Sequence, residues 1–180
     1  MNKYCNKLEL PFPPLREGYD LFRKDANHYL ISLNDMNHDI QNLLSEKGLS
    51  VPLIEVFYRK PRNISSIHTD NEGGDFVKIN WVYYGSNSIM SWFSIKENSE
   101  INKTTMMTTA GTPYLRFTHN EVTLEHSVSM QGSYLVQVGV PHQVINPKEE
   151  RYCLSFVLRK KDSSIISMQD ALHLLAEFIS

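Results

Sequence analysis

The residues best suited to chemistry in this chain begin with His68-Thr69-Asp70, which places an imidazole and a carboxylate two positions apart. Residues i and i+2 of a β-strand point to the same face, so both side chains can bind one metal ion. A structural interpretation competes, in which Asp70 opens the turn at 71–74 and His68 lies at a strand end. A third ligand is therefore needed before the pair indicates a metal site.

The third candidate ligand is His142, in the C-terminal third of the chain. We expect His142 to begin a short strand, followed by a turn that contains Pro147 and by a strand that begins at Arg151. Antiparallel neighbours joined in this way can place His142 and Arg151 in one cavity. Two histidines and one carboxylate form the facial triad typical of non-haem Fe(II), and a guanidinium is a suitable bidentate partner for a dicarboxylate.

Taken together, these motifs resemble those of the 2-oxoglutarate/Fe(II)-dependent oxygenases. The resemblance covers roughly residues 50–160 and depends on H-x-D, on P-H-x-V-x-N-P, and on an arginine soon afterwards in R-x-x-L-S-F. The segment 78–84, KINWVYY, is also similar to small bacterial and phage-type members. The resemblance implies a mainly β fold, a double-stranded β-helix (a cupin-like jelly roll) with a few flanking helices, including a C-terminal one.

The resemblance also implies a site and a reaction. His68, Asp70 and His142 would bind Fe(II), and Arg151 would bind the distal carboxylate of the cosubstrate 2-oxoglutarate. With O₂, the enzyme would hydroxylate an amino-acid side chain of a peptide or a small metabolite and release succinate and CO₂. Halogenating relatives carry a small non-ligand in place of the aspartate, so Asp70 favours hydroxylation.

The chain departs from the family pattern beside the arginine. Some relatives carry a serine two residues after it, where this chain has Cys153. We therefore expect Ser155, or a ring such as Tyr58, to supply the second hydrogen bond to the cosubstrate. A thiol that faces the cavity would be a liability near oxidising iron.

Asn80 is a further candidate for the cosubstrate site, because it lies in a predicted strand soon after H-x-D. Strand alternation leaves two possibilities open at this point. Either Asn80 and Val82 face the cavity, or the set Ile79, Trp81 and Tyr83 does.

Two other histidines and two other functions compete with this interpretation. His119 and His126 lack a partner at strand spacing and are interpreted as surface or turn residues. The alternative function is a cupin-like jelly-roll module that binds a sugar or small molecule without redox activity. A metal-dependent isomerase, or an oxygenase that does not use 2-oxoglutarate, is a third possibility.

Several short strands separated by turn residues must position these side chains. Such a series predicts an all-β sandwich or barrel with a few helices. The runs rich in β-branched and aromatic residues lie at 54–58, 76–84, 89–95, 134–138 and 152–158.

Helices are predicted on both sides of this region. Apolar spacing predicts a helix near 35–47, capped by Asn34 or Asp35 and ended by Gly48. Ser167 and Asp170 form a capping box for a C-terminal helix. The prolines of 8–15 predict an extended edge or arm.

The length of 180 residues, with 41% hydrophobic residues, fits one domain with a single core. We expect the β-helix core at 50–160, an N-terminal arm and helix at 1–49, and the C-terminal helix at 161–180. A formal charge of −2 argues against nucleic-acid binding. Without a signal or membrane segment, and with two cysteines interpreted as free thiols, the expected location is cytoplasmic. Two questions stay open: whether the chain forms a homo-oligomer, and whether residues 99–112 form a lid or a plain loop.

Overall fold

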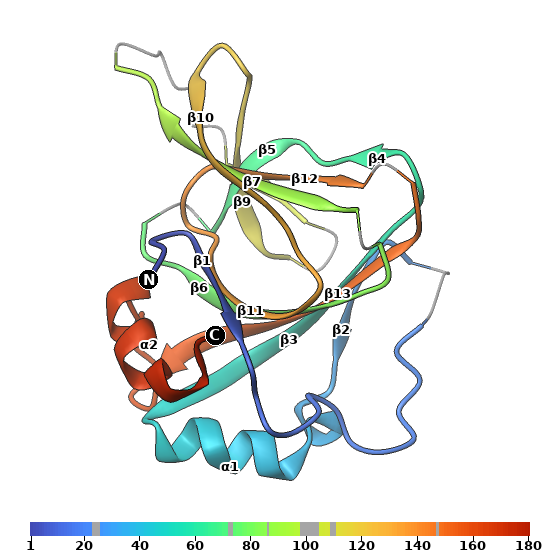
Figure 1. Cartoon of the computed structure of the whole chain (residues 1–180), viewed down its shortest axis with the longest axis vertical. Helices are drawn as coiled ribbons and strands as arrows, with labels where there is room; N and C mark the ends of the chain where they lie inside the picture. The colour runs from blue at the N-terminus through green and yellow to red at the C-terminus, as the bar shows by residue number, and fades with distance from the viewer. Residues whose placement is uncertain (23–25, 72–73, 86, 98–104, 109–110, 147) are drawn as a thin grey trace.

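Two antiparallel β-sheets dominate the computed structural model, which describes residues 1–22, 26–71, 74–85, 87–97, 105–108, 111–146 and 148–180 (Figure 1). Two α-helices, α1 (His38–Glu46) and α2 (Met168–Leu174), and 3-10 helices at Leu33–Asp35 and Ala176–Phe178 accompany them. The strands are β1 (Cys5–Leu8), β2 (His28–Ile31), β3 (Leu49–Arg59), β4 (Asn63–Ile64), β5 (Ile67–Asp70), β6 (Val77–Tyr83), β7 (Ile89–Ile95), β8 (Thr105–Met107), β9 (Pro113–Phe117), β10 (Val122–Ser129), β11 (Gly132–Gln137), β12 (His142–Asn146) and β13 (Arg151–Lys160).

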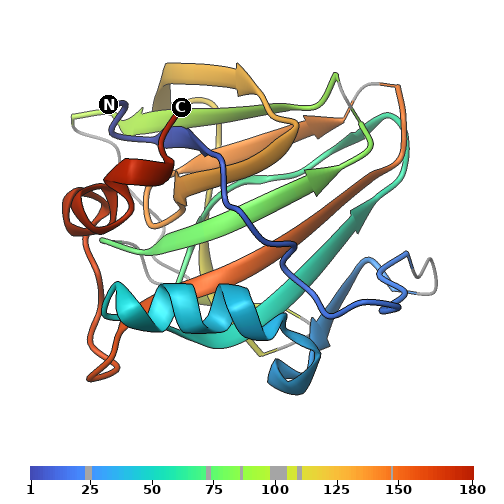
Figure 2. The ribbon, with the colours of Figure 1, turned by 60° about the horizontal axis from the view of Figure 1, so that its bottom comes forward.

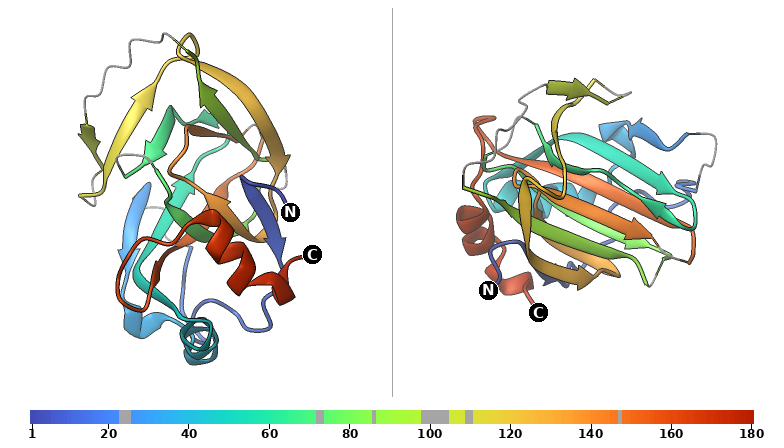
Figure 3. Two further views of the ribbon diagram at one scale, coloured as in Figure 1. Left: turned by 90° about the vertical axis from the view of Figure 1, so that its left-hand side faces the viewer. Right: turned by 90° about the horizontal axis from the view of Figure 1, so that it is seen from above.

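Strands from distant parts of the chain pair in a regular order. The first sheet has the order β1-β11-β6-β13-β3-β2, and the second has β10-β7-β12-β5-β9-β8 with β4 beside β12. Four antiparallel pairs, β7 with β10, β6 with β11, β5 with β12 and β3 with β13, run outward from the connection between β7 and β10. These eight strands therefore form one long hairpin whose successive pairs belong alternately to the second and the first sheet. Figure 3 shows the two sheets from two further sides.

Apolar side chains cover the outer face of the first sheet and part of its inner face. The outer face packs against α1 and α2, and α1 runs across this face (Figure 2). This outer cluster includes Ile40, Leu44, Ile54, Ile79, Leu154 and Leu172. The inner cluster joins the two sheets and includes Val82, Val136 and Cys153 from the first, with Met90 and Trp92 from the second.

The helix ends follow from local side-chain hydrogen bonds. Asn37 caps α1 by accepting from the N–H groups of Asp39 and Ile40, so the cap lies two residues beyond the predicted Asp35. Gly48 follows with φ of +77°, a left-handed conformation that glycine adopts without steric cost. At α2 the Ser167 hydroxyl accepts from the N–H of Asp170, as the sequence predicts.

The peripheral segments are described in part. The predicted N-terminal arm contributes β1, an edge strand on β11, before its prolines. Of the predicted loop at 99–112, residues 99–104 and 109–110 lie outside the described residues, and Thr105–Met107 pairs with β9. Within the described chain, no helix has the length and apolar character required to cross a bilayer.

Candidate functional site

The predicted ligands converge because two neighbouring strands carry them. Alternation on β5 puts His68 and Asp70 on one face, and β12 pairs with β5 at the position where His142 lies opposite His68. Asp70 Oδ1 lies 3.5 Å from Nε2 of His68 and 3.9 Å from Nε2 of His142. One ligand atom of each residue lies within 4.8 Å of the others, so the cluster can hold a metal ion.

Backbone carbonyls orient both imidazole rings. Nδ1 of His68 lies 2.8 Å from the Ser66 carbonyl oxygen, and Nδ1 of His142 lies 3.0 Å from that of Val140. Each Nδ1–H donates to its carbonyl, which leaves the lone pair on Nε2 facing the aspartate. A metal-binding histidine is held in this way. The resulting set of two nitrogens and one carboxylate oxygen is compatible with iron.

The charges of the cluster suit metal binding at neutral pH. Burial and the neighbouring His68 lower the pKa of His142 to about 4, so its ring is neutral. Burial alone would raise the pKa of Asp70, but the Lys78 ammonium and the two imidazoles outweigh it and hold that pKa well below its usual value. Asp70 is therefore an anion, and the neutral His142 ring can donate its Nε2 lone pair to a metal ion.

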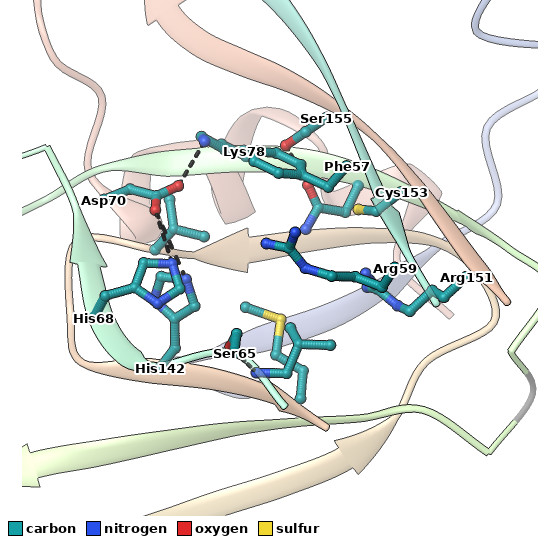
Figure 4. A pocket seen from close by; sticks show the side chains of 14 residues that line it. Phe57, Arg59, Ser65, His68, Asp70, Lys78, His142, Arg151, Cys153 and Ser155 are labelled. Carbon is teal, nitrogen blue, oxygen red and sulfur yellow. Dashed lines mark hydrogen bonds and ion pairs between the residues drawn. The ribbon is translucent and has the colours of Figure 1, made fainter. Parts of the chain in front are cut away.

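Lys78 ties the cluster to a second carboxylate. Its Nζ donates to Asp70 Oδ2 at 2.5 Å and to Glu55 Oε2 at 2.6 Å, and its side chain is only 2% exposed. The other oxygen of Glu55 lies 3.2 Å from Nε2 of His28. Lys78 thus occupies Oδ2 of Asp70, while Oδ1 faces the histidines (Figure 4).

Two guanidiniums enter the same cavity from the side opposite the histidines (Figure 4). Arg151 is 3% exposed, and its Nε donates to the Ser88 hydroxyl at 3.2 Å. Arg59 is its direct partner across the β3–β13 pair. Among the described residues, no carboxylate forms an ion pair with Arg59 or Arg151. The cavity therefore offers a metal-binding cluster at one side and uncompensated positive charge at the other.

The other predicted cosubstrate contacts divide by strand face. Asn80 and Ser155 both line the cavity, and the Ser155 hydroxyl donates to Asn80 Oδ1 at 2.6 Å. Tyr58 does not line it, which does not match the predicted contact. Because Phe57 and Arg59 face inward, Tyr58 points to the outer cluster, where it stacks on Tyr152.

The structure also shows which residues of β6 face the cavity. Lys78 and Asn80 line the cavity, whereas the alternative set Ile79, Trp81 and Tyr83 belongs to the outer cluster or packs against it.

The remaining reactive side chains lie apart from the ligands, except for one thiol. His126 stacks on Tyr4, and His119 is exposed near Phe93, so neither joins the cluster. Cys153 does line the cavity. Burial raises the pKa of Cys153. Its side chain therefore stays protonated, and a thiol is less reactive than a thiolate.

Sequence reasoning missed three charged residues: Arg59 and Lys78, which line the cavity, and Glu55, which is paired with Lys78. All three occur within or at the end of apolar strand segments. A charge inside such a segment is a usable signal, because lysine and glutamate are almost never fully buried unless they are paired.

Comparison with known proteins adds little. No protein-family model matches the chain, and no curated protein matches it. One match among solved structures is the crystal structure of Peruvianin-I, a cysteine peptidase from Thevetia peruviana latex. It shares 12% sequence identity with this chain at a TM-score of 0.37, over 91% of this chain and 94% of the other. A likeness at that TM-score supports no inference about activity.

Proposed function

We propose that this chain is a non-haem Fe(II)- and 2-oxoglutarate-dependent dioxygenase. The observation that carries the proposal is one cavity with the His68–Asp70–His142 cluster on one side and the buried guanidinium of Arg151 on the other. A 2-oxo acid with a second carboxylate has complementary ends, one that chelates a metal and one that pairs with a guanidinium.

The strand pairing supports the finer proposal of a double-stranded β-helix. A jelly roll combines antiparallel strands in two packed sheets. Here a long hairpin, with β7 and β10 at its inner end and β3 and β13 at its outer end, distributes its strands over two sheets. The ligand-bearing strands β5 and β12 are a middle pair of that hairpin.

Several side chains of the cavity have a defined role in this proposal. Bound iron, with 2-oxoglutarate and O₂, supplies the oxidation of a C–H bond with release of succinate and CO₂. Lys78 fixes the rotamer of Asp70, and the Ser66 and Val140 carbonyls fix the two imidazoles. Arg151 orients the cosubstrate by its distal carboxylate. The apolar side chains of Met90, Val138 and Val144 line the cavity and help to exclude water from it.

The first test is whether 2-oxoglutarate binding depends on the metal. We expect calorimetry to show 2-oxoglutarate binding to Mn(II)-loaded protein but not to chelator-treated protein. Asp70→Ala should weaken Mn(II) binding by about 100-fold or more, since one charged ligand of three is lost. Asp162→Ala, at an exposed aspartate, is the matched control.

Turnover provides the second measurement. Wild-type protein with Fe(II), ascorbate and 2-oxoglutarate should form succinate slowly without any substrate, and Asp70→Ala should not. Equal succinate formation by the two proteins would contradict the proposal. Metal-independent binding of anions, with no succinate, would instead support the redox-inactive binding module.

A further inference from the structure

Two adjoining chambers meet at the metal-binding cluster. Arg151 lines only the inner one, whereas the outer one has a volume of about 320 Å³ and extends to β4 and the start of β9. The residues that line both chambers are Phe57, Arg59, Ser65, His68, Asp70 and Lys78. Arg59 therefore stands where the inner chamber opens into the outer one.

Among the described residues of the outer chamber, Arg59 is the charged side chain that has no ion-pair partner. Lys78 is paired with both Glu55 and Asp70, and Glu55 also contacts His28. Arg59 has no such carboxylate, and burial together with the adjacent Arg151 lowers its pKa. A guanidinium stays charged in proteins, so a half-buried one beside a like charge favours the arrival of an anion.

The cosubstrate does not supply that anion. In the proposed function, one carboxylate of 2-oxoglutarate chelates the metal and the other pairs with Arg151. Both of its negative groups are then occupied, which leaves Arg59 without a partner. Resting on that function, we propose that Arg59 binds the carboxylate of a small, carboxylate-bearing prime substrate in the outer chamber.

The rest of the outer chamber agrees with a small polar acid. Asn63, Ser66 and Tyr114 add amide and hydroxyl groups to its wall, and Tyr114 lies edge-on to the ring of His68 at 6.1 Å. Arg59 and two of the three predicted metal ligands, His68 and Asp70, border this chamber. The carboxylate and the carbon to be oxidised must therefore belong to one compact molecule, such as a free amino acid.

The affinity for 2-oxoglutarate distinguishes the role of Arg59 from that of Arg151. In calorimetry on Mn(II)-loaded full-length protein, Arg151→Gln should raise the dissociation constant for 2-oxoglutarate by about 10- to 100-fold, the loss of a charge-assisted bidentate contact. Arg59→Gln should leave it within about threefold of wild type. Arg62→Gln, at an exposed arginine, is the matched control. An equal rise for Arg59→Gln and Arg151→Gln would assign Arg59 to the cosubstrate and overturn the inference.

A substrate panel tests the outer chamber directly. The probes are the free L-amino acids and their primary amides, each added to protein with Fe(II), ascorbate and 2-oxoglutarate. We expect at least one acid to raise succinate formation above background while its amide does not. Arg59→Gln should reduce that response by about tenfold or more, with partial recovery in Arg59→Lys, which keeps the charge but loses the bidentate geometry.

The outcomes distinguish the two proposals. Wild-type protein that binds no 2-oxoglutarate in the presence of Mn(II) would refute the proposed function, and this inference with it. Wild-type protein that binds 2-oxoglutarate, but responds equally to acids and amides or to no acid, would overturn only the role of Arg59.

Discussion

At the scale of single residues, Lys78 holds two buried carboxylates together. Replacing it by methionine leaves Glu55 and Asp70 without their shared ammonium, although Glu55 is only 1% exposed. We expect Lys78→Met to lower the free energy of unfolding by about 3–5 kcal/mol, the usual cost of an uncompensated buried charge. Urea denaturation at neutral pH with a chelator measures it.

A surface lysine in the same protein provides the control. Lys160 pairs with Asp170 at 3.0 Å, but both side chains are about half exposed. Lys160→Met should therefore cost only about 0–1 kcal/mol. Similar losses for the two variants would show that the buried cluster is not a special source of stability.

The cost of Lys78→Met should also depend on pH. Burial alone would raise the pKa of Glu55, but Lys78 and the hydrogen bond from His28 lower it below its usual value. A lowered carboxyl pKa stabilises the fold above the pKa of the unfolded chain, and that stability is lost as the pH falls through the folded value. In Lys78→Met, burial dominates and Glu55 is protonated more readily. The difference from wild type should therefore shrink as the pH falls toward about 4 and below it, in denaturation series at several pH values.

Residue-scale prediction succeeds where the geometry is local. The i and i+2 positions of His68 and Asp70 share a face in any strand, so their approach to one another follows from the sequence. Tyr58 and Arg59 differ by one position, and the face that each one occupies depends on how β3 pairs with β13. The sequence pattern leaves that register open, which is why Tyr58 was expected in the cavity and Arg59 was not.

At the scale of elements, the turn before β12 aligns the third ligand with the other two. The Val138 carbonyl accepts from the N–H of Asp70 at 2.7 Å, and the N–H of Gly139 lies 3.2 Å from the Phe76 carbonyl. A Cβ at Gly139 would lie 1.8 Å from the carbonyl oxygen of Gly74, so alanine cannot be accommodated without separating the two backbones.

Gly139→Ala should therefore disturb both stability and metal binding. We expect a loss of about 1–3 kcal/mol or more in the free energy of unfolding from overpacking. Misalignment of His142 with Asp70 should weaken Mn(II) binding by about 10- to 100-fold. Val140→Ala in the same turn removes atoms without a clash and keeps the carbonyl that orients His142, so it should retain the affinity. Wild-type affinity in Gly139→Ala would contradict this role of the turn.

The sequence predicts a strand or helix best where its side-chain pattern extends over many residues. The apolar runs at 54–58, 76–84, 89–95 and 152–158 each lie within or overlap an observed strand, and the capping box starts α2. The cap of α1 falls at Asn37 because a short 3-10 helix takes up Leu33–Asp35 first. Short peripheral strands such as β2 and β8 carry too few residues for a pattern, and only pairing with a neighbour defines them.

At the scale of the whole molecule, strand order is what the sequence pattern cannot supply. Apolar alternation identifies β3 and β13 as strands, but nothing local indicates that they pair with one another across most of the chain. That pairing brings Arg59 beside Arg151 and builds the cavity. The pair of neighbouring arginines is thus a property of long-range register, whereas the H-x-D pair is a property of one strand.

This architecture predicts that the two sides of the first sheet unfold together. Trp81 lies in the outer cluster and packs on Phe156, Trp92 lies in the inner cluster, and they are the chain's 2 tryptophans. Strands β6 and β13 contribute alternate residues to both clusters, so neither can melt while the other keeps its sheet. In Trp81→Phe and Trp92→Phe, the remaining tryptophan should report the same urea midpoint as the far-UV circular dichroism of that variant. A fluorescence transition that precedes loss of strand signal in either variant would show two separable units, contrary to a single cooperative domain.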